Sequence, residues 1–311
     1  MRRTAHLLLV SSLLAGAAIR SEAASIEGRW SLDARGGGDR VHLNLHRSWS
    51  EGGSQGSWSW TDDFARSDLR GLPAGPAQEG PVSLTLARDA GSLHLEGRLD
   101  HGQGEGGFTF ERDTTFVAFL KRAGYATPTD DELLRMCAED LGRSWIQDVA
   151  ALGIRGSSIA DIFRLRDNGV TTEFVRGLAA AGYGGLGSEE IVRLRVNGVT
   201  PEYIGGLGPA NGRRWSVEEV VRFRNNGLEA AYVSALAAKF DAEDIVRLHN
   251  NGVEASYVRD FRKLGYESAS ADEFVRLHNN GVSPDFARRA RELHGPVTTE
   301  ELIRLRVNGA Q

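Results

Sequence analysis

The feature that most constrains this chain is a unit of about 29 residues that recurs seven times after Arg112. Its Asn-Gly marker is spaced by 29, 29, 25, 29 and 28 residues, with the glycines at Gly169, Gly198, Gly227, Gly252, Gly281 and Gly309. An aromatic residue recurs in step with it, at Phe116, Trp145, Phe174, Tyr203, Tyr232, Tyr257 and Phe286. Self-similarity at this period is typical of stacked helical repeats.

Each unit carries the start and stop signals of two short helices. Thr200-Pro201 and Ser283-Pro284 place an N-cap and a first-turn proline at the start of the first helix. The second helix begins with a capping box, at Thr129/Glu132, Ser216/Glu219, Ser270/Glu273 and Thr298/Glu301. It ends at Asn-Gly, where glycine supplies a left-handed residue. Helices of two to three turns need neighbours for stability, so we expect an α-solenoid.

One unit is four residues shorter than the others. In it, Ala237–Asp241 leads directly into the next cap, without a Gly-Tyr turn of the kind found at Gly182-Tyr183 and Gly265-Tyr266. We therefore expect a local kink in the solenoid at this point.

The segment before the repeats has a different period. From Ile26 to about Glu111 apolar and polar residues alternate, as at Val41, Leu43 and Leu45, and glycine-rich turns separate five or six such segments. This pattern predicts a small antiparallel β-sandwich or an open barrel. The expected fold class is α+β in two regions, with a β-rich module at 24–113 and an array of about seven helix-turn-helix repeats at 114–311.

The N-terminus has the form of a secretory signal peptide at 1–23. Arg2-Arg3 precedes an apolar run from Leu7 to Ile19, which is short for a membrane span, and Ala23 suits cleavage. An uncleaved anchor is the alternative. We expect an exported protein in the periplasm or outside the cell, with no membrane span after signal removal. Cys137 is the single cysteine, so packing and not disulfides must stabilise the fold.

Composition and motifs argue against catalysis and nucleic-acid binding. A formal net charge of -5 and a pI near 5.9 do not suit a nucleic-acid partner. Gly52–Gly56 has the letters of a nucleophile elbow, and Gly102, Gly104 and Gly107 those of a dinucleotide loop, but both runs join strands and lack the required helix. We expect no catalytic residue, metal or cofactor. A rival enzyme would show a concave pocket with perturbed carboxyl groups.

A cationic or titratable residue recurs near the end of each second helix, and we call this series the cation stripe. Its members are Arg166, Arg195, Arg224, His249, His278 and Arg306. One hypothesis makes the stripe a groove for an anionic group or a partner. The alternative is structural: each cation complements the helix dipole while its stem packs on aromatic rings. A second series, including Arg193, follows acidic residues in the same helices and indicates solvated ion pairs.

The tryptophans of the β-rich module raise a similar choice. Trp49, Trp58 and Trp60 are candidates for an exposed glycan-binding platform, because aromatic rings on a sheet commonly bind carbohydrate or a partner. The alternative is that these rings fill the core of a small sheet.

The segment Leu194–Ile204, with Gly182-Tyr183 before it, resembles the repeats found C-terminal to BlaR/MecR-type sensor metallopeptidases in some bacteria. The resemblance covers about Phe108 to Gln311, and the peptidase domain, its transmembrane helices and its zinc motif are not found in this sequence. It implies an accessory, extracytoplasmic interaction role and assigns no functional residues. We expect a protein-interaction scaffold with another protein as partner, or alternatively a glycan-binding β module with the array as spacer; the sequence identifies no small-molecule ligand.

Signal removal is directly testable. We expect export to remove about 23 residues, because the apolar run has signal-peptide length. N-terminal sequencing of protein extracted from the cell envelope should begin near Ala24. A sequence that begins at Met1 would contradict this prediction.

Overall fold

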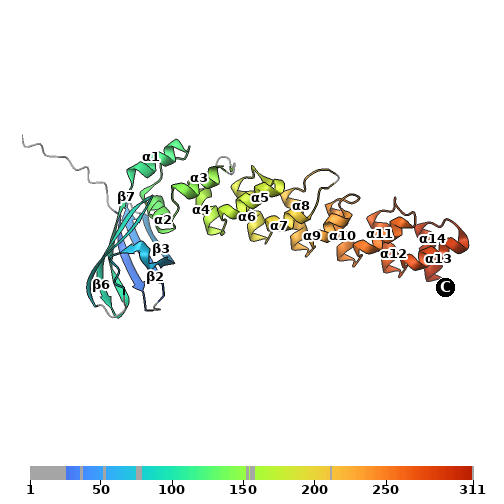
Figure 1. The fold of residues 1–311 in the computed structure, drawn as a ribbon, viewed down its shortest axis with the longest axis horizontal. Helices are drawn as coiled ribbons and strands as arrows, with labels where there is room; N and C mark the ends of the chain where they lie inside the picture. Colours follow the sequence, from blue (N-terminus) through green and yellow to red (C-terminus); the bar gives the residue numbers. More distant parts are fainter. Residues whose placement is uncertain are drawn as a thin grey trace, which may run out of the picture. The chain divides into compact units, whose positions relative to one another are not determined.

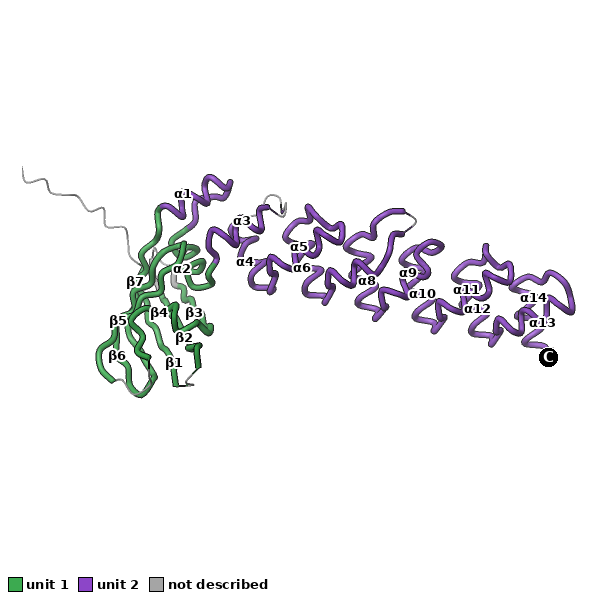
Figure 2. Tube along the Cα trace, viewed as in Figure 1, with its two compact units in different colours: residues 1–114, 129–140 green, residues 115–128, 141–311 purple. Residues whose placement is uncertain are grey.

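The computed structural model describes residues 26–35, 38–51, 54–74, 79–151, 154, 158–210 and 212–309, with the backbone alone at 49–51 and 54–55. Contacts divide the chain into two compact units (Figure 2). Unit 1 is Met1–Thr114 with Thr129–Asp140, and unit 2 is Thr115–Pro128 with Leu141–Gln311. The division differs from the sequence-based one in a single segment, 129–140, which joins the β-rich module.

Unit 1 is a curled antiparallel half-barrel of seven strands in the order β3-β2-β1-β7-β6-β5-β4 (Figure 1). Its strands are β1 (Ile26–Asp33), β2 (Arg40–Glu51), β3 (Ser54–Ala65), β4 (Leu69–Arg70), β5 (Gly80–Arg88), β6 (Gly91–Asp100) and β7 (Gln103–Arg112). A 3-10 turn, η1 (Arg66–Asp68), joins β3 to β4. One curled sheet corresponds to the open-barrel alternative of the sequence-based prediction. The two-residue strand β4 is too short to show the alternation of apolar and polar residues, so the sequence did not reveal it.

Trp30 anchors the inner face of this sheet. It is buried, and its indole N–H donates to the Glu96 carbonyl at 3.2 Å. Glycines make room for the ring: a Cβ on Gly97 would lie 2.7 Å from it, and a Cβ on Gly104 2.9 Å. Gly104 therefore lies in strand β7 and leaves room for the Trp30 ring. It does not belong to a dinucleotide-binding loop, which agrees with the interpretation of the glycine pattern in the sequence. The rest of the core comes from alternate strand residues, including Leu43, Leu45, Leu84, Leu86, Leu93, Leu95, Phe108 and Phe110.

Helix α2 (Asp130–Ala138) packs on β6 and β7, which places it in unit 1. Its buried residues are Leu133, Leu134, Met136, Cys137 and Ala138. The Cys137 thiol donates to the Gly91 carbonyl at 3.5 Å, and burial raises the pKa of Cys137 to about 12. The thiol therefore stays neutral and acts as a small apolar group.

Unit 2 is helical. Its helices are α1 (Thr114–Arg122), α3 (Arg143–Ala151), α4 (Ile159–Asp167), α5 (Thr172–Leu178), α6 (Ser188–Val196), α7 (Pro201–Gly206), α8 (Val217–Asn225), α9 (Ala230–Leu236), α10 (Ala242–Asn250), α11 (Ala255–Lys263), α12 (Ala271–Asn279), α13 (Pro284–His294) and α14 (Thr299–Val307). A distorted turn at Ala179–Tyr183 follows α5.

These helices pack in two rows. In the first-helix row, α3, α5, α7, α9, α11 and α13 each contact the next member. In the second-helix row, α4, α6, α8, α10, α12 and α14 do the same (Figure 1). Buried apolar residues form a continuous cluster between Val149 and Ile303. Helices too short to be stable alone are thus held by their neighbours.

The expected caps are confirmed. Capping boxes form at Thr129, Ser216, Ser270 and Thr298, and Thr200 and Ser283 cap helices that begin with proline. Each marker glycine has a positive φ, from 65° to 77°. After α6, the Val199 amide donates to the Leu194 carbonyl at 3.0 Å and the Gly198 amide to the Arg195 carbonyl at 3.1 Å. Such bonds satisfy the last carbonyls of the helix.

The phase of the repeat can be tested at Gly198 and Arg193. Gly198 has φ 67°, so Gly198→Val should destabilise the chain by about 1–2 kcal/mol or more. The Arg193 side chain is 48% exposed and pairs with Glu218 at 2.6 Å, so Arg193→Ala should cost about 0.2–1 kcal/mol. Thermal unfolding followed by circular dichroism should show a clearly larger loss for Gly198→Val. Equal losses would show that the assigned phase is incorrect.

Candidate interaction surfaces

Most stripe residues lie against the aromatic marker of their own repeat. The distances from the guanidinium carbon to the ring centroid are 5.3 Å for Arg195 on Phe174, 5.4 Å for Arg224 on Tyr203 and 5.5 Å for Arg306 on Phe286. The histidines meet their rings edge-on, with centroids 5.3 Å apart for His249 and Tyr232 and 5.5 Å apart for His278 and Tyr257. Arg166 is exposed in the last turn of α4.

Several stripe residues also reach the Asn-Gly turn of the preceding repeat. Arg224 Nε donates to the Gly198 carbonyl at 3.0 Å. A Cβ on Gly169 would lie 3.9 Å from Arg195, one on Gly252 3.6 Å from His278, and one on Gly281 3.9 Å from Arg306. The structure therefore brings these residues together along one side of the second-helix row.

Stripe residues differ in exposure. The four arginines are exposed, and the two histidines are half-buried. His278 Nδ1 is buried without a hydrogen-bond partner among the described residues. Cation–ring contacts at exposed sites contribute about 0.5–1 kcal/mol each, so the arginines have a modest structural role. Their exposure leaves the charged groups accessible to a partner.

A series of tyrosine hydroxyls forms hydrogen bonds between neighbouring elements, and the sequence did not predict these bonds. The hydroxyls donate to carbonyls 21 to 25 residues later: Tyr203 to Leu228 at 2.9 Å, Tyr232 to Val253 at 2.6 Å and Tyr257 to Val282 at 2.6 Å. Burial raises the pKa of Tyr203 to about 12, and raises the pKa of Tyr232 and Tyr257 as well. The 29-residue spacing located these rings in the sequence. The residues next to each tyrosine do not indicate which carbonyl accepts its hydrogen bond.

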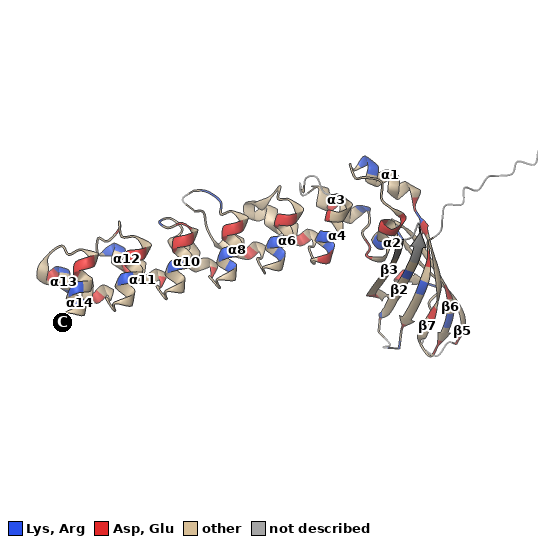
Figure 3. Cartoon of the chain, turned by 180° about the vertical axis from the view of Figure 1, so that it is seen from behind, with Lys and Arg blue, Asp and Glu red and all other residues tan. Residues whose placement is uncertain are grey.

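Ion pairs and amides also connect successive second helices. Arg193 pairs with Glu218 at 2.6 Å, Arg247 with Asp272 at 2.8 Å, and Arg276 with Glu300. Asn225 donates to Asn197 at 3.0 Å and Asn250 to Asn226 at 3.3 Å. Figure 3 shows basic and acidic residues alternating along this row. The arginine series that suggested pairs within one helix therefore also pairs between helices.

The structure places Trp58 and Trp60 on the core side of the half-barrel. In the β2–β3 ladder Trp58 pairs with Arg47 and Trp60 with the buried Leu45. Both indoles are half-buried, and the Trp60 ring meets the buried Phe64 edge-on at 5.2 Å. The side chain of Trp49 lies outside the described residues.

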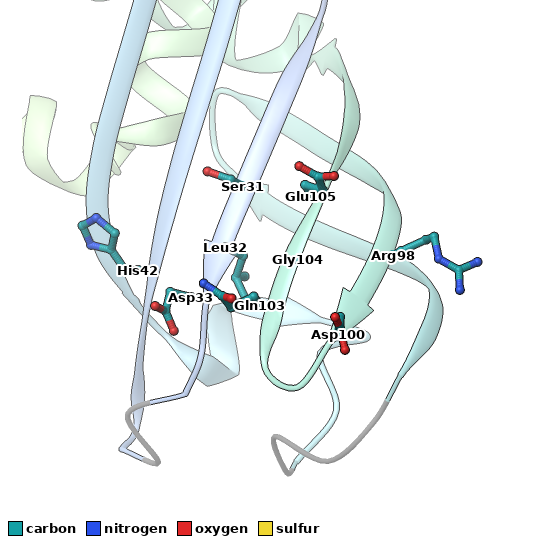
Figure 4. Close-up of a pocket in the computed structure, with 9 residues that line it drawn as sticks. All are labelled: Ser31, Leu32, Asp33, His42, Arg98, Asp100, Gln103, Gly104 and Glu105. Atoms are coloured by element: carbon teal, nitrogen blue, oxygen red, sulfur yellow. The ribbon is translucent and has the colours of Figure 1, made fainter.

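A polar hollow of about 510 Å³ lies on the opposite, outer face of the sheet (Figure 4). The ladder places Ser31 beside Glu105 and Asp33 beside His42, whereas the core-facing Leu32 pairs with Leu43. The residues that line the hollow are Ser31, Leu32, Asp33, His42, Arg98, Asp100, Gln103, Gly104 and Glu105. The sequence reading missed this hollow, because its residues come from four strands.

One group of described residues has a spacing that could hold a metal ion. His101 contacts Glu79 at 3.0 Å and Asp100 at 2.6 Å, and all three side chains are exposed. The hydrogen bond that His101 donates to Asp100 and the nearby carboxylate charges raise the pKa of His101. The group is thus an exposed ion-pair triad, and no second feature points to a metal.

No protein-family model matches the chain, and no curated protein matches it. Among the described residues, no helix has both the length and the apolar character needed to cross a membrane.

The buried tyrosines predict a loss of stability at high pH. Below pH 10 the Tyr203 hydroxyl is neutral in both states; between pH 10 and about 12 it ionises only in the unfolded chain, which lowers folding stability. The double variant Tyr203→Phe/Tyr232→Phe should be less stable at pH 7 by about 1 kcal/mol per hydrogen bond but lose less on going to pH 11. Thermal midpoints measured from pH 7 to 11 test this. Parallel curves for wild type and variant would contradict it.

Proposed function

We propose that this chain is a non-enzymatic exported protein in which the helical repeats form an α-solenoid that binds another protein. The observation that carries the proposal is the alignment of the stripe side chains along one row of helices, with Arg195, Arg224, His278 and Arg306 each near the turn of the preceding repeat. Repeat arrays commonly bind partners along one such aligned surface.

Three features support a solenoid of about seven repeats. The marker residues recur at 29-residue spacing, the helices of each row contact their neighbours in order, and the apolar cluster continues through the rows. The ion-pair and asparagine contacts link the second helices of successive repeats, and the tyrosine hydroxyls link the first helix of a repeat to the turn after its second helix. Nearest-neighbour contacts of this kind are typical of solenoids.

The carboxyl groups with the lowest pKa values have structural causes. Hydrogen bonds from Arg35 lower the pKa of Asp33 to about 2, and those from Arg213 lower the pKa of Glu219 to about 2. Burial raises the pKa of Asp244, but this residue begins α10 and lies 3.5 Å from Arg247. Paired carboxylates in helix caps and hairpins are poorly suited to general acid–base catalysis. This supports the non-enzymatic part of the proposal.

The proposed location and partner rest on sequence features. The charged start and short apolar run support export, and the resemblance to repeats beside BlaR/MecR-type sensors supports an extracytoplasmic interaction role. The net charge of -5 argues against a nucleic-acid partner.

A second candidate function is glycan binding by the β-rich module, with the array as spacer. The polar hollow favours it, because hydroxyl, carboxylate, amide and guanidinium groups surround a volume that would hold a small polar ligand. The half-buried Trp58 and Trp60 lie on the other face, so they and the hollow do not form one site. Capture by cell-wall glycan that is lost in Glu105→Gln would favour this candidate.

The cation stripe gives the test of partner binding. The full chain is immobilised, partners captured from envelope extract are identified by mass spectrometry, and the affinity of the main partner is measured. Arg195→Gln/Arg224→Gln should weaken binding by about tenfold and reduce its salt dependence, because two exposed charges are lost. The thermal midpoint should fall only slightly, since each ring contact contributes about 0.5–1 kcal/mol.

The matched control is Arg195→Lys/Arg224→Lys, which keeps both charges and should keep most of the affinity. If the glutamine variant binds as wild type does, the stripe is scaffolding. If binding is lost only in step with unfolding, the structural alternative holds.

A further inference from the structure

The short repeat opens a groove between α9 and α11. Helix α9 ends at Leu236 and the cap of α10 follows at Asp241, while α11 continues to Lys263. The last turn of α11 therefore extends beyond the end of α9. A groove of about 340 Å³ lies there, lined by Ala235, Leu236, Ala255, Val258, Arg259, Arg262, Lys263 and Glu267.

The short connection after α9 leaves this groove open. In the next repeat, Arg291 on α13 lies over the ring of Tyr266, 5.5 Å from its centroid. Arg262 on α11 is the equivalent of Arg291, 29 residues earlier. The shorter connection after α9, Ala237–Phe240, has no tyrosine that could lie beneath Arg262 in the same way. Arg262 is consequently half-buried beside an open groove.

The groove combines an apolar floor with a basic rim. Leu236 is 3% exposed and Val258 1%, and the two alanines complete the floor. Three cations and one carboxylate form the rim. Arg259 and Lys263 share Asp260, at 3.4 and 3.3 Å, whereas the Arg262 side chain has no ion pair or hydrogen bond within the described part of the chain. Complementing the helix dipole accounts for cations in the last turn of α11, but not for the apolar space beside them.

We propose that the α9–α11 groove binds an acidic peptide segment that places an aliphatic side chain on the floor and carboxylates against Arg262 and Lys263. This inference rests on the proposed partner-binding function and names a site and a partner chemistry for it. The volume is at the lower end of the range for binding pockets and suits a few side chains of a peptide. Its position on the first-helix row separates it from the cation stripe.

The test uses a fluorescein-labelled hexapeptide of alternating aspartate and leucine, with the full chain, in fluorescence anisotropy. Arg262→Glu should weaken binding by about tenfold, because it reverses the charge that faces the carboxylates. Ala235→Arg should weaken it as much, because the new side chain fills the groove although it adds positive charge. The matched control Arg289→Glu makes the same charge change on α13, outside the groove, and should change affinity by less than about twofold.

Substituting serine for the leucines of the peptide should also weaken binding by about tenfold, because the floor then has no apolar partner. Lys263→Glu provides a second charge variant at a side chain that is 68% exposed, in case Ala235→Arg perturbs α9. It should weaken binding by about threefold or more.

Several results would overturn the inference. These are no binding of the aspartate–leucine peptide to wild type, equal losses for Arg262→Glu and Arg289→Glu, or tighter binding by a correctly folded Ala235→Arg. Stronger competition by an oligothymidylate of equal charge would assign the groove to nucleic acid instead. If the groove variants bind the captured partner normally while the stripe variants do not, the groove inference fails and the proposed function stands. If the full chain captures no protein from envelope extract, the proposed function fails.

Discussion

The short length of the helices in unit 2 is the constraint on which the rest of the unit depends. With six to eleven residues each in α3 to α14, they have too few hydrogen bonds to be stable in water alone. Each helix must therefore bury one face against the next member of its row. Each second helix must also end in a tight turn that leads directly into the first helix of the next repeat. Asparagine followed by glycine at positive φ meets that need. Because these turns stack in order, the side chain beside each turn is set by geometry, and a cation or histidine that complements the helix dipole occupies the place.

Interactions between residues close in sequence could be predicted from the sequence, whereas interactions between distant residues could not. Caps, first-turn prolines and marker glycines act within four or five residues, so the sequence located them. The tyrosine hydroxyls bond to carbonyls more than twenty residues away, and the chemistry of a tyrosine does not name its acceptor. The same limit applies to α2. Its capping box is local and was found, but its packing on β6 and β7, with Cys137 reaching Gly91 46 residues away, is what places it in unit 1.

In the β-rich module, the alternation of residues showed that one face is buried but not which strands are neighbours. The pairing register supplies this information, since a shift of one residue reverses the faces. It places Trp58 and Trp60 with the core and the polar hollow on the other side. Sequence spacing could not assemble the hollow, because Asp33, His42, Arg98 and Glu105 come from four different strands. The fit of Trp30 over Gly97 and Gly104 likewise joins strands that are distant in sequence.

The short repeat shows that a change in the length of one connection affects the two rows of helices differently. The four-residue deletion shortens the connection after α9, yet α10 still contacts α8 and α12. Tyr232 still donates to Val253 and Asn250 to Asn226 across the same repeat. The second-helix row therefore absorbs the deletion without losing its contacts, and the effect appears in the first-helix row as an open groove. In an array where each repeat contacts only its neighbours, such a change stays local. The first-helix row can thus vary in surface while the second-helix row keeps the register, so the groove belongs to one repeat whereas the cation stripe is common to the repeats along the second row.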